Sequence, residues 1–375
     1  MPKAKLAFCL FEFVPFGGMQ KNLLQIAKAC MARGHQVDVY AKFWAGKIPD
    51  GFQVSLLPAR GVTNHRRCES FAKRLTKYLA TRPYDAVVGF NKMPGLDVYY
   101  AADTCFAAKA NSRRFWYRWT GRCRTYLRLE RSVFDKQAKT EILLISKREK
   151  AIYTDYYGTS EHRFHLLPPG ISKDCLAPEN AAVVRAGLRA ELAIGLDHNV
   201  VLMVGSGFRT KGVDRGIRAI SALPPNIRNK TTLLVVGQDR TKPFRRLAKR
   251  LGVGKQVHFV GGREDVPRFL VGADLLLHPA YRENTGTVLI EAMAAGLPVL
   301  ATDVCGFSDH VEGAGAGELV PSPFRQERLN HLLVSMLTSA DRASWGANGQ
   351  EYVAKTDVFS RPEKAADIIE QVVGC

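Results

Sequence analysis

Short apolar runs alternate with helical stretches along almost the whole chain. The runs are largely continuous in apolar character, which is typical of parallel strands that helices cover on both faces. An amphipathic pattern after the first run predicts a helix over residues 19–33, which Gly34 ends. The runs form two consecutive series of doubly wound length, so the sequence predicts two Rossmann-like α/β domains in tandem. The predicted strands are residues 6–11, 36–41, 52–57, 85–90, 98–103 and 141–146, then 200–207, 231–238, 256–262, 274–280 and 297–304.

The boundary between the two domains is expected near a proline-rich turn. With 375 residues, the chain is longer than one hydrophobic core usually serves. The strand pattern restarts after Pro168-Pro169-Gly170, a cluster typical of a linker. We therefore expect an N-terminal domain over residues 1–168 and a second domain over residues 169–360. Ligands of such sheets bind beyond the carboxyl ends of the strands, so two facing domains would hold the active site in the cleft between them.

Several protein classes are excluded by what the sequence lacks. No apolar run approaches the roughly 18 residues of a spanning helix, and the run at 6–11 is too short for a signal peptide, so we expect a cytoplasmic protein. The eight cysteines have no zinc-like or CxxC spacing and are expected to be free thiols, and no metal site is expected. Hydrolase-elbow, zincin and dinucleotide motifs are absent as well.

The positive charge is concentrated in the first half of the chain. Against a net charge of +19, residues 1–168 carry 29 Lys and Arg and 13 Asp and Glu, whereas residues 169–375 carry 25 and 22. This asymmetry suggests that the first domain faces a polyanion, either nucleic acid or an acidic membrane.

Residues 106–131 combine eight cations with six aromatic rings and a single acid, Glu130. Arginines interleaved with aromatic rings suit the headgroup layer of an anionic membrane. A partly packed helix with a solvated cationic face is the plain alternative, and single-stranded RNA is a rival that no RNA-binding motif supports. We therefore predict contact with anionic lipids and no nucleic-acid partner. The expected membrane contacts are Arg113, Arg114, Phe115, Trp116, Arg118, Trp119, Arg122 and Arg124.

Two loops of the first domain carry candidate site residues. Pro15-Phe16-Gly17-Gly18 follows the first strand, and its glycines would let a substrate or phosphate approach the backbone amides of a helix start. An ordinary tight turn explains the same residues. Asp103 ends the strand at 98–103 and could orient a sugar or an acceptor hydroxyl, or could cap the following helix.

The loop at residues 205–212 of the second domain carries Arg209 and Lys211. A guanidinium and an ammonium beside helix amides suit a pyrophosphate, although the Walker A order is absent and a solvated basic loop is equally compatible.

Glu283 and Glu291 are eight residues apart, at the start of a predicted helix. The amides of Asn284, Thr285, Gly286 and Thr287 are free there to donate to an anion. Glu291 could hold a ribose diol, and Glu283 would face the group that the anion carries. Two unrelated glutamates on an exposed helix face are the plain alternative. His278, which ends the strand before them, is expected to be structural rather than catalytic.

These residues give the chain a family resemblance. The E-x7-E pair, Gly17-Gly18 and Lys211 resemble the retaining GT-B glycosyltransferases of family 4, nearly from end to end. The segments FVPFGGMQ, GFNKMPGLDVYYAAD, LLPPGI, KGVDR and DLLLHPAY resemble the lipopolysaccharide core glucosyltransferases of Gram-negative bacteria. The resemblance implies a GT-B fold, with two Rossmann-like domains facing across a cleft and residues 361–375 packing back on the first domain.

The resemblance also implies an activity. It is transfer of glucose from UDP-glucose, with retention, to the first heptose of a heptosylated lipid A acceptor at the inner face of the inner membrane. No metal or other cofactor is expected. Lys211 and Arg209 would hold the diphosphate, Glu291 the uridine ribose and Glu283 the hexose hydroxyls, while Asp103 would position the reacting sugar.

Two alternatives remain at this stage. Because Asn284 and Thr285 are polar where small apolar residues can occur, the donor could be another UDP-hexose such as an N-acetylhexosamine. A basic module that binds lipid or RNA without transferase activity would leave the second domain unexplained.

Overall fold

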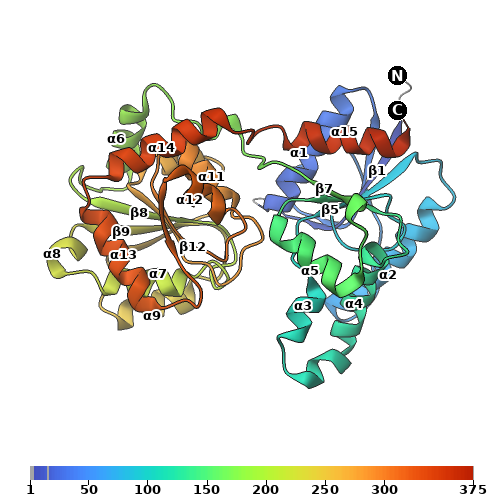
Figure 1. Ribbon diagram of the computed structural model, residues 1–375, viewed down its shortest axis with the longest axis horizontal. Helices are drawn as coiled ribbons and strands as arrows, with labels where there is room; N and C mark the ends of the chain where they lie inside the picture. The colour runs from blue at the N-terminus through green and yellow to red at the C-terminus, as the bar shows by residue number, and fades with distance from the viewer. Residues whose placement is uncertain (1–3, 15–16, 375) are drawn as a thin grey trace. The chain divides into compact units, whose positions relative to one another are not determined.

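The computed structural model describes residues 4–14 and 17–374, and its chain divides into two compact units (Figure 1). Unit 1 comprises residues 1–168 and 360–375, and unit 2 comprises residues 169–359. The chain therefore leaves unit 1 after Pro168 and returns to it at Ser360. Pro15 and Phe16 of the predicted glycine turn, and Cys375, lie outside the described residues.

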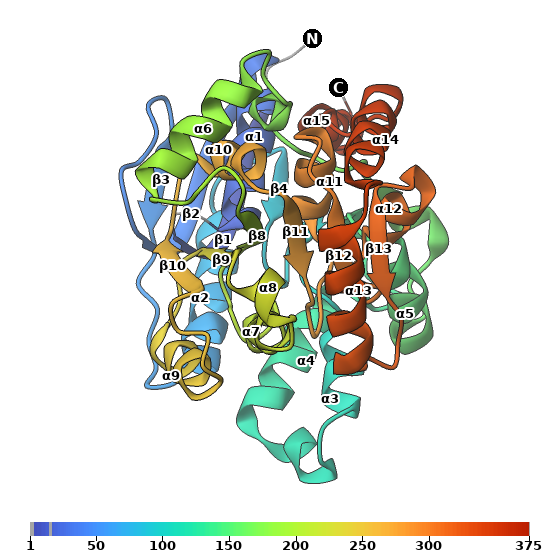
Figure 2. The same cartoon turned by 90° about the vertical axis from the view of Figure 1, so that its left-hand side faces the viewer.

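The described part of unit 1 holds a parallel sheet of seven strands in the order β3-β2-β1-β4-β5-β6-β7. The strands are mostly buried, as their apolar runs predict, and helices cover both faces of the sheet (Figures 1 and 2). The strands are β1 (Lys5–Phe13), β2 (Gln36–Trp44), β3 (Gln53–Leu56), β4 (Ala86–Gly89), β5 (Val98–Ala101), β6 (Glu141–Leu144) and β7 (Phe164–Leu166).

Two hydrophobic clusters lie on the two faces of this sheet. One contains side chains of α1 and α15, and the other contains side chains of α2, α4 and α5. The helical elements of unit 1 are α1 (Gly18–Ala32), α2 (Asn64–Leu79), α3 (Phe106–Asn111), η1 (Phe115–Trp119), α4 (Gly121–Phe134), α5 (Lys147–Tyr157), η2 (Glu161–Arg163) and α15 (Arg361–Val373).

Helix α15 packs along α1, although more than 300 residues separate them in sequence (Figure 1). Arg361, which is 1% exposed, donates to the carbonyl oxygen of Pro168 at 2.9 Å. Arg33 bonds the carboxylates of Asp367 and Glu370 at 2.8 and 2.7 Å. One partly buried and two exposed polar contacts thus fix the C-terminal helix to the first unit.

Unit 2 repeats the architecture with six described parallel strands in the order β10-β9-β8-β11-β12-β13. The strands are β8 (Asn199–Val204), β9 (Thr231–Val236), β10 (Val257–Gly261), β11 (Leu275–His278), β12 (Val299–Thr302) and β13 (Gly317–Val320). The helical elements are η3 (Lys173–Cys175), α6 (Ala181–Glu191), α7 (Val213–Ser221), α8 (Pro225–Arg228), α9 (Lys242–Arg250), α10 (Val266–Gly272), α11 (Thr287–Ala294), α12 (Ser308–Ala314), α13 (Gln326–Thr338) and α14 (Arg342–Lys355).

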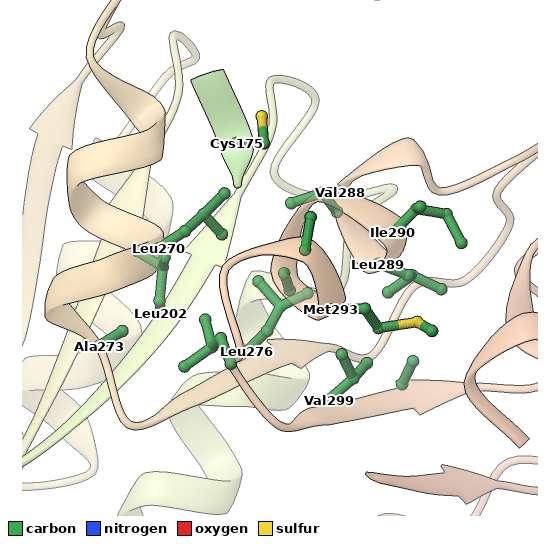
Figure 3. Close-up of a cluster of buried hydrophobic side chains, with 14 of the residues drawn as sticks. Cys175, Leu202, Leu270, Ala273, Leu276, Val288, Leu289, Ile290, Met293 and Val299 are labelled. Atoms are coloured by element: carbon green, nitrogen blue, oxygen red, sulfur yellow. The ribbon is translucent and has the colours of Figure 1, made fainter. Parts of the chain in front are cut away.

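Helix α11 is anchored in the core of unit 2. Six of its eight residues are buried, and Figure 3 shows Leu289 and Met293 above Leu276 and Val299 of the sheet. This packing fixes the N-terminus of α11 near the carboxyl ends of the strands.

All eleven predicted strands form, but two further strands, β7 and β13, were not predicted. Both lie at the edge of a sheet and have only three and four residues. Glu318 and a glycine interrupt the apolar pattern of β13, so neither strand has a continuous apolar run.

The basic aromatic segment 106–131 is divided among α3, η1 and α4, and is not one helix. Thr120 ends η1 and caps α4, because its hydroxyl accepts the amide of Cys123 at 3.2 Å. The segment extends away from the sheet of unit 1 in both views (Figures 1 and 2). Throughout the described residues, each helix is too short or too polar to cross a membrane, and all seven cysteines there are free and buried.

Candidate active site

The strand order of unit 2 reverses between β8 and β11, which lie side by side (Figure 2). The chain leaves these two strands in opposite directions, so the loops that follow them diverge, and doubly wound sheets bind their ligands at this point, beyond the carboxyl ends of the strands. The loop after β8 carries Arg209 and Lys211, and the loop after β11 carries Glu283. The topology therefore brings these sequence-predicted residues to the place where doubly wound sheets bind ligands.

Glu283 lies between two basic side chains. The ammonium of Lys211 forms an ion pair with one oxygen of the Glu283 carboxylate, and His278 Nε2 lies 3.2 Å from the same oxygen. The side chains of His278 and Glu283 are only 1% and 12% exposed. Lys211 and Glu283 are thus in direct contact, and His278, which we expected to be structural, takes part in the same cluster.

Opposing effects set the charge states of this cluster. Burial disfavours the charged form of Glu283, but the hydrogen bond from His278 and the charge of Lys211 outweigh it and lower its pKa to about 2. Burial also lowers the pKa of His278, more than its contact with Glu283 raises it. At neutral pH the cluster therefore consists of a carboxylate, an ammonium and a neutral imidazole that donates through Nε2, while no described residue bonds Nδ1.

The KGVDR segment attaches the loop after β8 to the loop after β11. Arg215 donates to the carbonyl oxygens of Pro279 and Ala280 at 3.1 and 2.9 Å, and its guanidinium lies 3.6 Å from the centre of the Tyr281 ring. The Tyr281 hydroxyl in turn donates to Asp214 at 2.8 Å. These contacts hold the chain that leads to Glu283. The sequence alone assigns no role to Asp214 and Arg215.

Helix α11 presents the other predicted donor-site residues. Gly286 caps the helix with a left-handed backbone (φ +81°), which permits the sharp turn from the loop into the helix. Thr285 is buried, Asn284 and Thr287 are half-buried, and Glu291 lies one turn into the helix, also half-buried. The first amides of an α-helix lack intrahelical acceptors, so an anion at this end would meet N–H donors.

Arg209 stands apart from the Glu283 cluster. Its side chain is exposed, and none of the described carboxylates forms an ion pair with it. It shares the loop with Lys211, whereas only Lys211 reaches Glu283.

Unit 1 shows the same arrangement at its own switch point, between β1 and β4. Gly17 caps α1 in an extended conformation, and Gly18 begins the helix. A Cβ at Gly18 would meet no atom within 4 Å, so steric crowding within the protein does not require glycine there. The space beside Gly18 is open to a ligand.

A pocket of about 400 Å³ lies at the carboxyl ends of β1, β4 and β5 within unit 1. Asp103 is exposed and lines it, together with Asn91 and Lys92 from the loop after β4. Met19 and Gln20, which follow the glycine pair, line it as well. The pocket therefore connects Asp103 with the start of α1.

Glu130 settles which residue caps α3. Its buried carboxylate accepts the backbone amides of Phe106 and Ala107 at 2.6 and 2.8 Å, and Lys92 Nζ at 2.5 Å. The side chain of the N-cap residue Cys105 forms no capping bond, and Glu130 rather than Asp103 accepts the first amides of α3, so the capping alternative for Asp103 is wrong. The only acid of the basic aromatic segment is thereby turned into the protein.

The rings and cations predicted to contact a membrane are largely exposed. Phe115, Trp116 and Trp119 are 76%, 51% and 66% exposed, which is unusual for side chains of this size. Arg113, Arg114, Arg118 and Arg124 are exposed around them, and Arg122 lines the pocket that contains Asp103. The described residues include no group of three His, Cys, Asp or Glu side chains that could hold a metal ion.

Comparisons with known proteins agree with this architecture. The family of group 1 glycosyl transferases matches residues 184–352, and glycosyltransferase family 4 matches residues 16–174. The first match lies within unit 2 and the second covers most of unit 1 and the first residues of unit 2. The two domains together define a glycosyltransferase of the GT-B class.

Individual relatives narrow the class. The lipopolysaccharide glucosyltransferase WaaG of Escherichia coli (strain K12) is 44% identical over 366 residues, covering 97% of this chain and 98% of that protein. The chain therefore belongs to the family of WaaG. The crystal structure of WaaG, described as a glycosyltransferase involved in lipopolysaccharide biosynthesis, matches with a TM-score of 0.94 over 97% of this chain and 99% of that one. Anabaena HepE in complex with UDP-glucose shares the fold at 20% identity, with a TM-score of 0.76 over 98% of this chain and all of that one.

Proposed function

We propose that the chain transfers glucose from UDP-glucose, with retention of configuration, to the first heptose of the lipopolysaccharide inner core. The observation that carries this proposal is the end-to-end similarity to WaaG, 44% identity over 97% of this chain. The Lys211–Glu283 pair at the switch point of unit 2 supports it, because it offers a cation for a diphosphate beside a carboxylate for sugar hydroxyls.

Unit 2 would bind the donor. The leaving UDP acquires negative charge as the glycosidic bond breaks, and Lys211 Nζ with the first amides of α11 would stabilise that charge without a metal. Glu291, one turn along α11, would accept hydrogen bonds from the ribose diol. Arg209 would add charge from the exposed side of the loop.

Glu283 would change partners when the donor binds. In the ligand-free protein its carboxylate pairs with Lys211. A diphosphate competes for the same ammonium, and the released carboxylate oxygen can then accept a hexose hydroxyl. The remaining contact with His278 keeps the carboxylate charged and oriented during this exchange.

Unit 1 would bind the acceptor. An acceptor hydroxyl attacks the anomeric carbon from the face that UDP leaves, so that the new carbon–oxygen bond forms as the old one breaks and the hydroxyl proton passes to the departing phosphate. Asp103 would orient this hydroxyl and form no covalent bond. Gly18, beside which the space is open, would let a substrate approach the start of α1 closely, and Gly17 precedes it as the N-cap.

We further propose that residues 113–124 hold the enzyme at the cytoplasmic face of the inner membrane. The exposed rings of Phe115, Trp116 and Trp119 would enter the headgroup layer, and the arginines would attract anionic lipids, each by roughly 1 kcal/mol. Co-sedimentation with phosphatidylglycerol-rich vesicles and with neutral vesicles at low salt tests this. Equal binding to both would refute the electrostatic part.

The catalytic proposal is tested by mixing the protein with a heptose-terminated acceptor and UDP-glucose, UDP-galactose, UDP-N-acetylglucosamine or UDP-N-acetylgalactosamine. We expect acceptor-dependent release of UDP only with UDP-glucose, undiminished by EDTA. Preference for another UDP-sugar would refute UDP-glucose as the proposed donor. Loss of activity in EDTA that Mg²⁺ or Mn²⁺ restores would refute the metal-free mechanism.

A further inference from the structure

The unit 1 pocket that contains Asp103 is lined by more cations than carboxylates. Four cations line it, Lys42, Lys92, Lys109 and Arg122, against the two carboxylates of Glu12 and Asp103. A neutral sugar needs hydrogen-bond partners but no positive charge beyond that which the protein's own carboxylates balance, so an excess of positive charge in this pocket points to an acidic ligand.

Lys42 and Lys92 are paired with carboxylates of the protein. The Lys42 ammonium, with a side chain 5% exposed, bonds the Glu12 carboxylate at 2.5 Å and Asn64 Oδ1 at 3.2 Å. Lys92 bonds Glu130 at 2.5 Å and the carbonyl oxygen of Thr104 at 3.0 Å. These contacts form a rigid and nearly neutral wall.

Arg122 differs from these lysines. It is exposed at the pocket, its guanidinium lies 5.8 Å from the centre of the Tyr126 ring, and no carboxylate among residues 4–14 and 17–374 is paired to it. It also stands in the first turn of α4, which contains no acidic residue. The positive end of a helix dipole disfavours a cation there, whereas an anion bound beside Arg122 would be favoured by both charges.

Asp103 makes one part of the pocket negative. Its carboxylate repels an anion, so an acidic group in the same pocket would be directed toward Arg122 and Lys109, and a neutral hydroxyl toward Asp103. A ligand with one acidic group and one reactive hydroxyl would thus bind in a single orientation.

We propose that this pocket recognises an acidic group, a carboxylate or a phosphate monoester, on the glycan that accepts the glucose. Arg122 and Lys109 bind the acidic group, and Asp103 receives the hydroxyl. The inference rests on the proposed function, since it concerns the acceptor of that reaction. It makes Arg122 a specificity determinant for the acceptor in addition to its predicted membrane contact.

The test uses lipid-free acceptors, so that membrane binding does not contribute. Four soluble heptosides are compared, with UDP-glucose as donor. They form two pairs of an acid and its neutral counterpart. One pair is a heptoside with a neighbouring carboxylate and its methyl ester, and the other is a heptoside with a phosphate monoester and the same compound with a hydroxyl in place of the phosphate. For the wild-type enzyme we expect about a tenfold lower KM for at least one acid than for its neutral counterpart, with kcat within about twofold. The acid that shows the difference identifies the group.

Arg122→Gln is expected to remove this preference by raising the KM of the acid about tenfold while leaving the KM of its neutral counterpart unchanged. Lys109→Gln is the second variant and is expected to act in the same direction. Arg66→Gln is the matched control, because Arg66 is also exposed in the first turn of a helix of unit 1 but lies outside the pocket.

Equal KM values for acids and neutral counterparts in the wild type would overturn the inference, as would an equal effect of Arg122→Gln on both. Turnover of the neutral heptosides shows that the proposed glucosyl transfer itself holds. Absence of turnover with all four heptosides and with the full-length acceptor would instead refute the proposed function.

Discussion

Replacing Lys211 by alanine is expected to separate the catalytic role of this residue from its structural one. The substitution removes the cation that we assign to the diphosphate, and loss of one such donor costs about a hundredfold in kcat/KM, or about 2.7 kcal/mol of transition-state stabilisation. It also leaves the Glu283 carboxylate, 12% exposed, with His278 as its remaining basic contact. Loss of a partner to a buried charged group costs on the order of 1–3 kcal/mol of folding free energy.

Both quantities can be measured on one preparation. Initial rates of UDP release at subsaturating UDP-glucose give kcat/KM, and urea unfolding gives the free energy of unfolding. Lys230→Ala is the control, since Lys230 pairs with Asp197 in the same unit but is 60% exposed and precedes β9, at the end of the sheet opposite the site. A Lys211→Ala enzyme within twofold of the wild-type kcat/KM would refute the phosphate assignment, whatever its stability.

Three other changes test the surroundings of this pair. His278→Gln keeps an N–H donor for Glu283 and should retain most of the activity, whereas His278→Leu should lower kcat/KM at least about tenfold. Equal kcat/KM values for these two variants at pH 7.5 would show that the hydrogen bond to Glu283 does not support catalysis. Gly212→Ala should lower the free energy of unfolding in urea by about 2 kcal/mol or more, because φ is +75° and a Cβ would lie 2.0 Å from the carbonyl oxygen of Pro279. The control is Gly187→Ala in α6, where a Cβ meets no atom within 4 Å, so this substitution should be neutral or stabilising. The pKa of His278 is below 6.5 and that of Glu283 is about 2 instead of 4.5, so in acid the unfolded chain binds more protons than the folded one. The free energy of unfolding should therefore fall as the pH drops below 6.5, and between pH 6.5 and 5 it should fall less steeply in His278→Gln. Parallel pH curves for the wild type and His278→Gln would contradict the lowered pKa of His278.

The sequence predicts the fold well because burial leaves a local signature. Strands such as β9 (Thr231–Val236) are covered on both faces, and their continuous apolar runs are visible without any tertiary information. The edge strands β7 and β13 escape detection because an edge strand needs no such run. The division of residues 106–131 into three pieces depends on single capping contacts, such as that of Thr120, which periodicity does not reveal.

The candidate site was predictable residue by residue but not as a network. Lys211 and Glu283 stand out because charged residues in post-strand loops have few structural explanations. Their direct contact is decided by the strand order, in which β8 and β11 are neighbours although 70 residues of chain separate them. The five-residue spacing of His278 and Glu283 was a usable signal, whereas Glu130, which caps α3 and holds Lys92, has only long-range partners.

We propose that unit 2 neutralises the diphosphate of the donor with Lys211 and the first turn of α11. A crystal structure with UDP tests this most directly. We predict that the β-phosphate contacts Lys211 Nζ and an amide between Gly286 and Val288, that the ribose hydroxyls contact Glu291, and that Glu283 no longer bonds Lys211. Uridine diphosphate bound elsewhere on unit 2, with the Lys211–Glu283 pair intact, would contradict the account.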